Sequence, residues 1–287
     1  EVENASGDIC LAVNAKLLMD SLKEFAEQPL QFDIDEGNLA VVVKTANGNY
    51  NFIGLRGDEY PELPVLGDNA QSLTMPVEVL ANGVSKAVFA TADDDLRPTM
   101  TGIFFDIKPE DVTFVATDAH KLVRLKNMAV KSGVDASFIL PKKPAGLLKA
   151  VIAKEVGDVE ISFDQKNIAF RLPSYTMVCR QIEGRFPNYN GVIPQNNPYR
   201  LIIDRVSLMN AAKRVFAFSN QGTGLIKLAI SNNQLVVSAQ DIDFSTSAEE
   251  TLVCQYDGNE ITIGFKAPFL IDILNNINSS DIIMALA

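Results

Sequence analysis

Residues 102–125 read GIFFDIKPEDVTFVATDAHKLVRL, and this stretch decides the fold because a version of it returns later in the chain. Two runs rich in β-branched and aromatic side chains flank the turn residues at 108–111, which predicts a hairpin followed by a third apolar run. The pattern returns at 224–241, where Ala239 corresponds to Ala116 at a distance of 123 residues. A unit that recurs along a chain predicts a repeat architecture.

Two kinds of unit alternate along the chain. The first kind is a strand and a helix that lead into such a hairpin, and it is predicted at 73–91 and 201–218. The second kind is a strand, an amphipathic helix and three further strands. It is predicted at 11–64 and 138–194, and a third copy starts at residue 260. These patterns predict an α+β fold built from repeated modules of helices and antiparallel sheets.

The order of the units predicts three domains of similar construction. We expect the C-terminal half of a first domain at residues 1–68, a middle domain at 69–195 and a third, C-terminally incomplete domain at 196–287. The linkers at 66–72 and 195–199 are polar and rich in Gly, Asn, Gln and Pro, which is typical of loops between structured segments.

The composition limits the number of domains, the cellular compartment and the class of protein that the chain can represent. The chain has 287 residues, 47% of them hydrophobic, which is enough for two or three domains with their own cores. Cys10, Cys179 and Cys254 lie far apart and form neither a disulfide framework nor a metal-binding pattern, which favours a reducing compartment. No apolar run approaches the length of a bilayer, and the first residues lack a signal-peptide pattern. We therefore expect a cytoplasmic protein with no membrane partner.

The residues that most enzymes and metal sites need are scarce. His120 is the single histidine, and no phosphate-binding glycine loop accompanies it. Asp118 and His120 could form an acid–base pair, but a turn-stabilising Asp and a surface His explain the same residues. The acids at 93–95 could bind a cation, but adjacent acids do not converge without a looped frame, so we interpret them as a solvated loop. We expect no catalytic residue, no metal site and no cofactor.

The net charge of −11 argues against a surface that binds nucleic acid everywhere. It leaves room for a basic face, because charge effects are local at physiological salt. Matched helices carry a basic residue at equivalent positions, for example Lys86 and Lys213. On a single helix this pattern is typical of a solvated face, whereas over the whole set it indicates cations that converge on phosphates. The candidate DNA-facing residues are Lys23, Lys86, Arg97, Lys149, Lys213 and Arg214.

Four segments together carry a resemblance to a known family. They are 97–102 (RPTMTG), 115–122 (VATDAHKL), 184–189 (GRFPNY) and 265–274. With these segments in this order, the chain resembles the bacterial DNA sliding clamps, the beta subunits of DNA polymerase III, truncated at both ends. The resemblance implies the DNA clamp fold and a non-catalytic, head-to-tail ring dimer, in which helices line a central channel and sheets form the outside.

In this family, a groove on the middle and third domains receives short peptides from the replicative polymerase, the clamp loader and repair polymerases. Carried over by motif, the groove would here be lined by Met100, Thr117, Ala119, His120, Lys121, Leu122, Pro187, Val192, Lys266 and Phe269. An apolar groove with few polar anchors suits such peptides. The chain departs from the family pattern in four ways. Members often have Gly where Ala119 stands and Arg where Lys121 stands, and some have Arg where Gly191 stands. Some carry aromatic DNA-contacting residues where this chain has Pro98 and Thr99, and the C-terminal tail that completes the groove in the family is expected to be missing.

The same resemblance implies a dimer edge, formed by Tyr50, Phe52, Ala217 and Phe218. The first two belong to the first domain and the last two to the third. The aromatic residues could instead be ordinary core side chains, because strand residues alternate between faces and one face is buried. Polar contacts at the rim are expected from residues 47–49 and 249–250.

These observations predict a replication processivity factor that encircles duplex DNA without sequence preference and tethers the polymerase. The alternative from another class is a β-rich repeat scaffold or adhesion module with no nucleic-acid role. The cysteine pattern, which favours a reducing compartment, argues against this alternative. An enzyme is the third hypothesis, and it would need convergent acids with shifted pKa values in one cleft.

Overall fold

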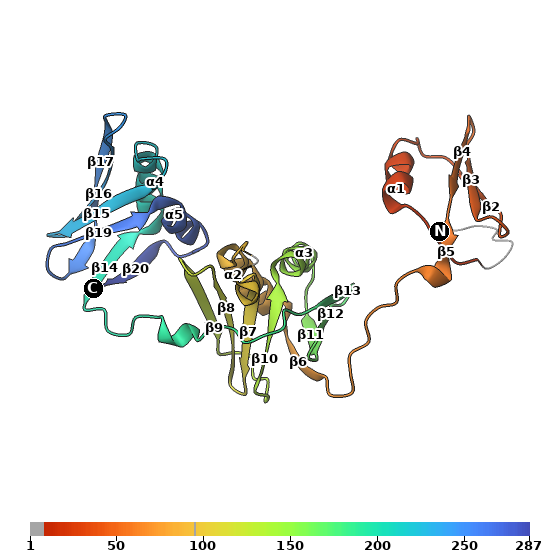
Figure 1. Ribbon diagram of the computed structural model, residues 1–287, viewed down its shortest axis with the longest axis horizontal. Coiled ribbons are helices and arrows are strands. Elements are labelled where there is room, and N and C mark those ends of the chain that lie inside the picture. Colours follow the sequence, from red (N-terminus) through yellow and green to blue (C-terminus); the bar gives the residue numbers. More distant parts are fainter. Residues whose placement is uncertain (1–8, 95) are drawn as a thin grey trace. The chain divides into compact units, whose positions relative to one another are not determined.

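The computed structural model describes residues 9–94 and 96–287, and Figure 1 shows their helices and strands. The chain forms two compact units, residues 1–63 and 64–287. All strand pairs of the described residues are antiparallel, as the modular α+β prediction requires. Residues 1–8 of the predicted first domain and Asp95 of the predicted acidic loop lie outside the described residues.

The first unit combines one helix with two small sheets, β2-β3-β4 and β1-β5. Asn14 begins the helix, because its Oδ1 accepts a hydrogen bond from the Leu17 amide at 3.0 Å. The Asn47-Gly48 turn, a typical hairpin sequence, joins two strands of the larger sheet, and the Thr45 amide donates to the Gly48 carbonyl at 2.9 Å. The elements are β1 (Leu11–Ala12), α1 (Ala15–Lys23), β2 (Gln31–Ile34), β3 (Ala40–Lys44), β4 (Asn49–Ile53), β5 (Leu55–Arg56) and the 3-10 turn η1 (Gly57–Glu59).

The middle part of the chain repeats one module twice. Each copy is a strand, a helix and three further strands, so the two kinds of unit that the sequence predicts have the same order of elements. The first copy is β6 (Gln71–Pro76), α2 (Val77–Ala87), β7 (Gly102–Lys108), β8 (Asp111–Thr117) and β9 (Leu122–Asn127), with the 3-10 turns η2 (Val88–Ala90) and η3 (Pro98–Met100). The second copy is β10 (Ala136–Pro141), α3 (Lys142–Ile152), β11 (Asp158–Phe163), β12 (Asn167–Arg171) and β13 (Thr176–Arg180), followed by η4 (Tyr189–Gly191).

The two copies exchange their first strands. β10 pairs with β7 of the first copy, and β6 pairs with β11 of the second, which gives the sheets β10-β7-β8-β9 and β13-β12-β11-β6. One hydrophobic core therefore contains side chains of both copies, including the stacked rings of Phe105 and Phe138, whose centroids lie 4.4 Å apart. Neither copy can complete its sheet without the other.

The third part of the chain follows the same plan. β19 pairs with β15 and β14 with β20, so the first strand of each module again crosses to the other sheet. A separate hydrophobic core fills this part of the second compact unit. Its elements are β14 (Tyr199–Asp204), α4 (Arg205–Phe216), β15 (Leu225–Ser231), β16 (Gln234–Asp241), β17 (Thr246–Val253), β18 (Gln255–Asp257), β19 (Ile261–Lys266), α5 (Ala267–Asn275) and β20 (Asp281–Leu286).

Helix α2 packs directly on an aromatic ring through Gly83. A Cβ at this position would lie 2.4 Å from Cε1 of the buried Phe114. We expect Gly83→Ala to lower the free energy of unfolding by about 1–3 kcal/mol, because overpacking outweighs the helix preference of Ala. Gly146→Ala in α3 is the control, since a Cβ there meets nothing within 4 Å. Urea unfolding midpoints measure both, and a Gly83→Ala midpoint at or above wild type would contradict the packing argument.

Candidate functional site

The loop between β8 and β9 is a tightly bonded turn. Asp118 Oδ1 accepts hydrogen bonds from the amides of His120 at 2.9 Å and Lys121 at 2.8 Å, and Asp118 Oδ2 pairs with Lys121 Nζ at 2.6 Å. Thr117 Oγ1 donates to the Lys121 carbonyl at 2.8 Å. Burial alone would raise the pKa of Asp118, but the hydrogen bonds from Lys121 and from the two amides hold that pKa below its usual value. These contacts fix the direction in which the loop presents its side chains.

Ala119 has a left-handed backbone with φ of +72°. A side chain at such a position costs about 1–2 kcal/mol, which explains why glycine would suit it. The amide of Ala119 donates to Thr117 Oγ1 at 3.1 Å, which helps to hold the strained turn.

Phe269 of α5 joins this loop from a distant part of the sequence. Its ring stacks on His120 with centroids 5.4 Å apart and an angle of 17° between the planes. Two ammonium groups lie near the same ring, Lys121 Nζ at 4.8 Å and Lys266 Nζ at 5.3 Å from the centroid. Four residues that the sequence placed in the groove are thus in contact around one aromatic ring.

A second apolar region lies beside the loop, on the outer face of the sheet β10-β7-β8-β9. Phe104 stacks on Phe186 with centroids 4.7 Å apart, and the Tyr189 hydroxyl donates to Asp106 Oδ2 at 2.7 Å. Burial, followed by the hydrogen bond to Asp106, raises the pKa of Tyr189. An open cleft of about 450 Å³ borders this region and is lined by Leu122, Arg124, Val192, Ile193 and Pro194.

The cleft contains two predicted groove residues, Leu122 and Val192. Met100, in η3, and Pro187 are half-buried and are not among its lining residues. Sequence reasoning missed Arg124, although the two-residue alternation of a strand places it on the same face as Leu122. Ile193 and Pro194 carried no sequence signal.

Two of the six predicted DNA-facing cations are engaged within the protein. Lys86 Nζ donates to the Asn276 carbonyl at 2.5 Å and to Asn278 Oδ1 at 2.6 Å, beyond the C-terminal end of α5. Burial, with the charges of Arg205 and Lys149, lowers the pKa of Lys86. Arg214 forms a fork with Glu250 of β17, with both hydrogen bonds at 2.7 Å.

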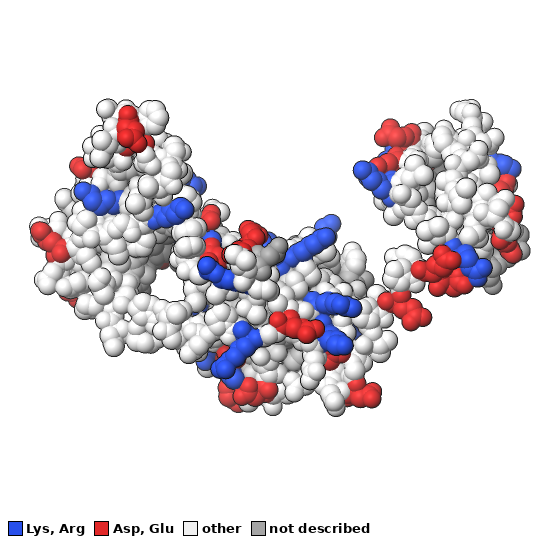
Figure 2. Space-filling model, in the orientation of Figure 1, with Lys and Arg blue, Asp and Glu red and all other residues white. Residues whose placement is uncertain are grey.

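The other four candidates are less constrained. Lys149 and Lys213 are exposed and form no ion pair with any residue in the described ranges, and Arg97 is likewise exposed and unpaired there. Lys23 lies 3.9 Å from Asp20. Figure 2 shows basic and acidic side chains interspersed over the visible face.

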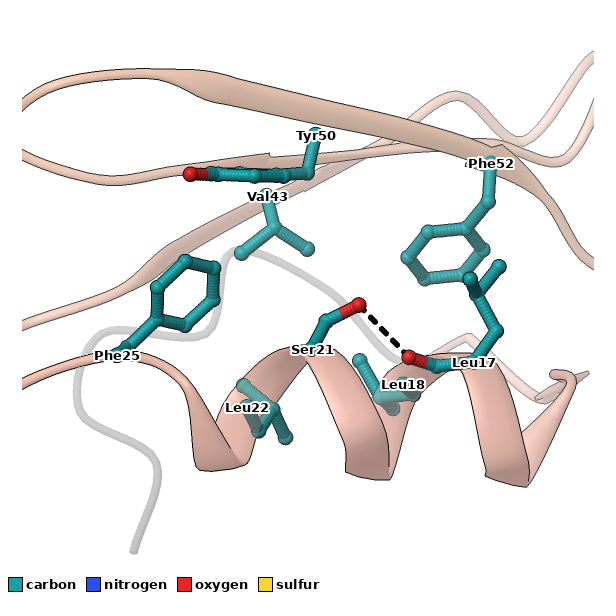
Figure 3. A pocket seen from close by; sticks show the side chains of 8 residues that line it. All are labelled: Leu17, Leu18, Ser21, Leu22, Phe25, Val43, Tyr50 and Phe52. Carbon is teal, nitrogen blue, oxygen red and sulfur yellow. Dashed lines mark hydrogen bonds between the residues drawn. The ribbon is translucent and has the colours of Figure 1, made fainter.

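The first unit carries an apolar pocket between α1 and the strands β3 and β4 (Figure 3). Helix α1 buries none of its residues, although Leu17, Leu18 and Leu22 lie on its pocket side. Tyr50 is 46% exposed and meets Phe25 edge-on, with ring centroids 4.9 Å apart. Tyr50 is therefore only partly buried. The complete lining is Leu17, Leu18, Ser21, Leu22, Phe25, Val43, Tyr50 and Phe52.

The predicted partner residues lie just beyond α4. Ala217 is exposed, and Phe218 is 45% exposed and is held by its amide, which donates to the Val215 carbonyl at 3.0 Å. The neighbouring β17 ends the sheet β17-β16-β15-β19, just as β4 ends the sheet β2-β3-β4. Each predicted dimer patch thus lies beside an edge strand with one unpaired side.

Within residues 9–94 and 96–287, no group of three His, Cys, Asp or Glu side chains could hold a metal ion. No helix in these same ranges is long and apolar enough to cross a membrane.

Comparison with known proteins agrees with the repeated modules. Residues 74–188 match the family model of the DNA polymerase III beta subunit central domain, and residues 190–287 match that of its C-terminal domain. The curated beta sliding clamps of Synechococcus elongatus and Staphylococcus aureus are 28% and 22% identical to the chain. These alignments cover 96% and 98% of this chain, and 74% of each relative.

Comparison with solved structures also identifies sliding clamps as similar proteins. The sliding clamp of Bartonella birtlesii, bound to griselimycin, matches with a TM-score of 0.89 at 27% identity over 99% of this chain and 77% of that chain. The DNA polymerase III subunit beta of Pseudomonas aeruginosa matches with a TM-score of 0.89 at 25% identity over 96% of this chain and 75% of that chain.

Proposed function

The chain belongs to the DNA polymerase III beta subunit family, the sliding clamps, and from this premise we propose that two copies close head to tail into a ring around duplex DNA. The chain is a processivity clamp and a non-catalytic subunit of the holoenzyme. This membership sets aside the alternatives of an adhesion scaffold and of an enzyme. The cytoplasm of a bacterium, where the chromosome lies, is the proposed place of action.

The observation that carries the ring proposal is the pair of unpaired strand edges with uncovered apolar side chains beside them. Leu18 and Leu22 of α1 are half-buried, whereas Leu17 and Met19 are 52% and 54% exposed, so part of the apolar surface of this unit is uncovered. Phe218, beside the β17 edge, is an exposed aromatic side chain of the kind that anchors protein interfaces. A contact is heterologous when one patch on a copy binds a different patch on the next copy. Repeating such a contact makes a ring if the rotation between neighbouring copies brings the last copy back to the first.

We assign DNA contact chiefly to cations that the protein leaves unengaged. Arg214 is neutralised by Glu250, and Lys86 holds the end of α5, so these two residues also have structural roles. Lys149 and Lys213 are exposed and unpaired within the described ranges. Lysines that contact phosphates supply affinity without sequence information, which suits a ring that moves along duplex DNA.

The test of this function is retention on a nicked circular duplex after loading. We expect wild type to remain until the circle is linearised and then to slide off, because an encircling ring is held by topology. Lys149→Glu with Lys213→Glu should shorten the lifetime on the closed circle roughly tenfold at 0.1 M salt. The control is Lys166→Glu with Lys227→Glu, which makes the same charge change at exposed positions of a turn and a sheet. Release that does not depend on linearisation would contradict encirclement, and equal lifetimes for the two variants would contradict the DNA assignment.

We assign partner docking to the groove formed by the 117–122 loop, Phe269 and the adjoining cleft. Its aromatic and aliphatic lining with few polar groups suits short peptide anchors. The proposed partners are the replicative polymerase, the clamp loader and repair polymerases.

A further inference from the structure

Arg124 occupies an unusual place in the docking groove. Strand β9 is the last strand of its sheet, and its residues alternate between two faces. Val123 and Leu125 contact the hydrophobic core, whereas Leu122 and Arg124 line the open cleft with Val192, Ile193 and Pro194. Arg124 is the charged residue in an otherwise apolar lining.

Two carboxylates near this cleft, Asp118 and Asp106, are already engaged by other side chains. Asp118 pairs with Lys121 at 2.6 Å, and Asp106 accepts the Tyr189 hydroxyl and lies 3.6 Å from Lys108. Arg124 has no carboxylate within 4 Å among the residues that the structure describes. Its field nevertheless reaches the neighbouring side chains. Burial and Asp106 raise the pKa of Tyr189, and the charge of Arg124 acts in the opposite direction.

A guanidinium beside an apolar cleft favours a specific kind of ligand. A bound apolar side chain would exclude water from one side of Arg124, which strengthens its attraction for a carboxylate. Arginine also presents parallel N–H donors that match a carboxylate in a bidentate geometry. Charge complementarity therefore points to an acidic partner, even though the clamp as a whole has a net charge of −11.

We propose that Arg124 is a specificity-determining residue that selects docking peptides with an acidic side chain two positions from their apolar anchor. The inference rests on the proposed peptide groove. Leu122 and Arg124 are two residues apart on an extended strand, a separation of roughly 7 Å. An extended peptide covers the same distance in two residues, so the carboxylate lies two positions from the anchor that contacts Leu122.

The experiment selects peptides from a random nonapeptide library displayed on phage, using the full chain. Phage that also bind Phe269→Ala are removed first, so the remaining pool depends on the groove. The pool selected on wild type should be enriched in Asp and Glu two positions from an apolar residue. The pool selected on Arg124→Gln should lose that enrichment.

Affinities of the leading peptide and of its Glu→Gln form then measure the preference by fluorescence anisotropy. We expect the acidic form to bind wild type three- to tenfold more tightly, and Arg124→Gln to bind the two forms equally. The preference of wild type should shrink in 0.5 M salt. Lys126→Gln is the matched control, because Lys126 is on the same face of β9 but is already paired with Asp111 at 2.9 Å, and it should keep the preference.

The outcomes separate this inference from the groove itself. Equal acidic enrichment in the two pools, or an unchanged affinity ratio in Arg124→Gln, would overturn the role of Arg124 while peptide docking stands. If no peptide in the wild-type pool depends on Phe269, the groove proposal fails and this inference fails with it.

Discussion

Phe218→Asp is expected to leave the protein monomeric at micromolar concentration, under conditions in which the proposed ring makes wild type a dimer. Phe218 is 45% exposed beside the β17 edge, and its proposed partner is the β4 edge of the second copy, where Tyr50 is 46% exposed. Placing a carboxylate in an apolar interface costs about 3 kcal/mol or more, which corresponds to at least roughly a hundredfold weaker association. Light scattering gives the solution mass directly.

The control for this prediction is Tyr175→Asp, which changes another exposed aromatic residue, in the turn between β12 and β13. It should leave the dimer intact. A dimeric mass for Phe218→Asp would remove this residue from the interface, and a monomeric wild type would leave the proposed ring without a source of closure.

Phe269→Ala combined with His120→Ala should weaken the binding of a groove peptide about a hundredfold. The two rings stack on each other, so the double change removes the aromatic wall at the junction of the β8–β9 loop and α5. Buried aromatic anchors at interfaces each contribute about 2 kcal/mol or more when truncated, although such values are not strictly additive. Fluorescence anisotropy with a peptide selected on wild type measures the loss.

Leu147→Ala supplies the comparison for that experiment. Leu147 is an exposed side chain on α3, the helix that corresponds to α5 in the repeat. Its variant should bind the peptide as wild type does, and circular dichroism should show all variants folded. Wild-type affinity in the folded double variant would mean that the peptide binds elsewhere.

Local patterns in the sequence were sufficient to predict the modules. Turn residues such as Asn47-Gly48, the helix cap at Asn14 and the apolar spacing of each element act over a few residues, so they can be identified without the fold. The recurrence of the hairpin then predicted the repeat, and the observed order of strands and helices confirms it.

Local sequence patterns could not predict the contacts between distant segments. The sequence could place Lys86 on a helix but not beside Asn276, because the acceptor is a backbone carbonyl at the end of a helix about 190 residues away. Arg214 and Glu250 were assigned to different surfaces, whereas the structure joins them in one fork. The exchange of β6 and β10 between modules is of the same kind, since pairing partners are chosen by packing rather than by any local signal.

The strand exchange also sets an order of events during synthesis on the ribosome. Hairpins such as β7–β8 are local and form within microseconds, but β6 must wait for β11, which begins 82 residues after β6 ends. At a translation rate of roughly 5–20 residues per second, that wait lasts roughly 4–16 s. During this time Leu73 and Met75, which end up in the core, have no partner strand to cover them. The nascent chain is therefore most vulnerable to aggregation in the interval between the two modules of one domain, and chaperone binding should be concentrated there.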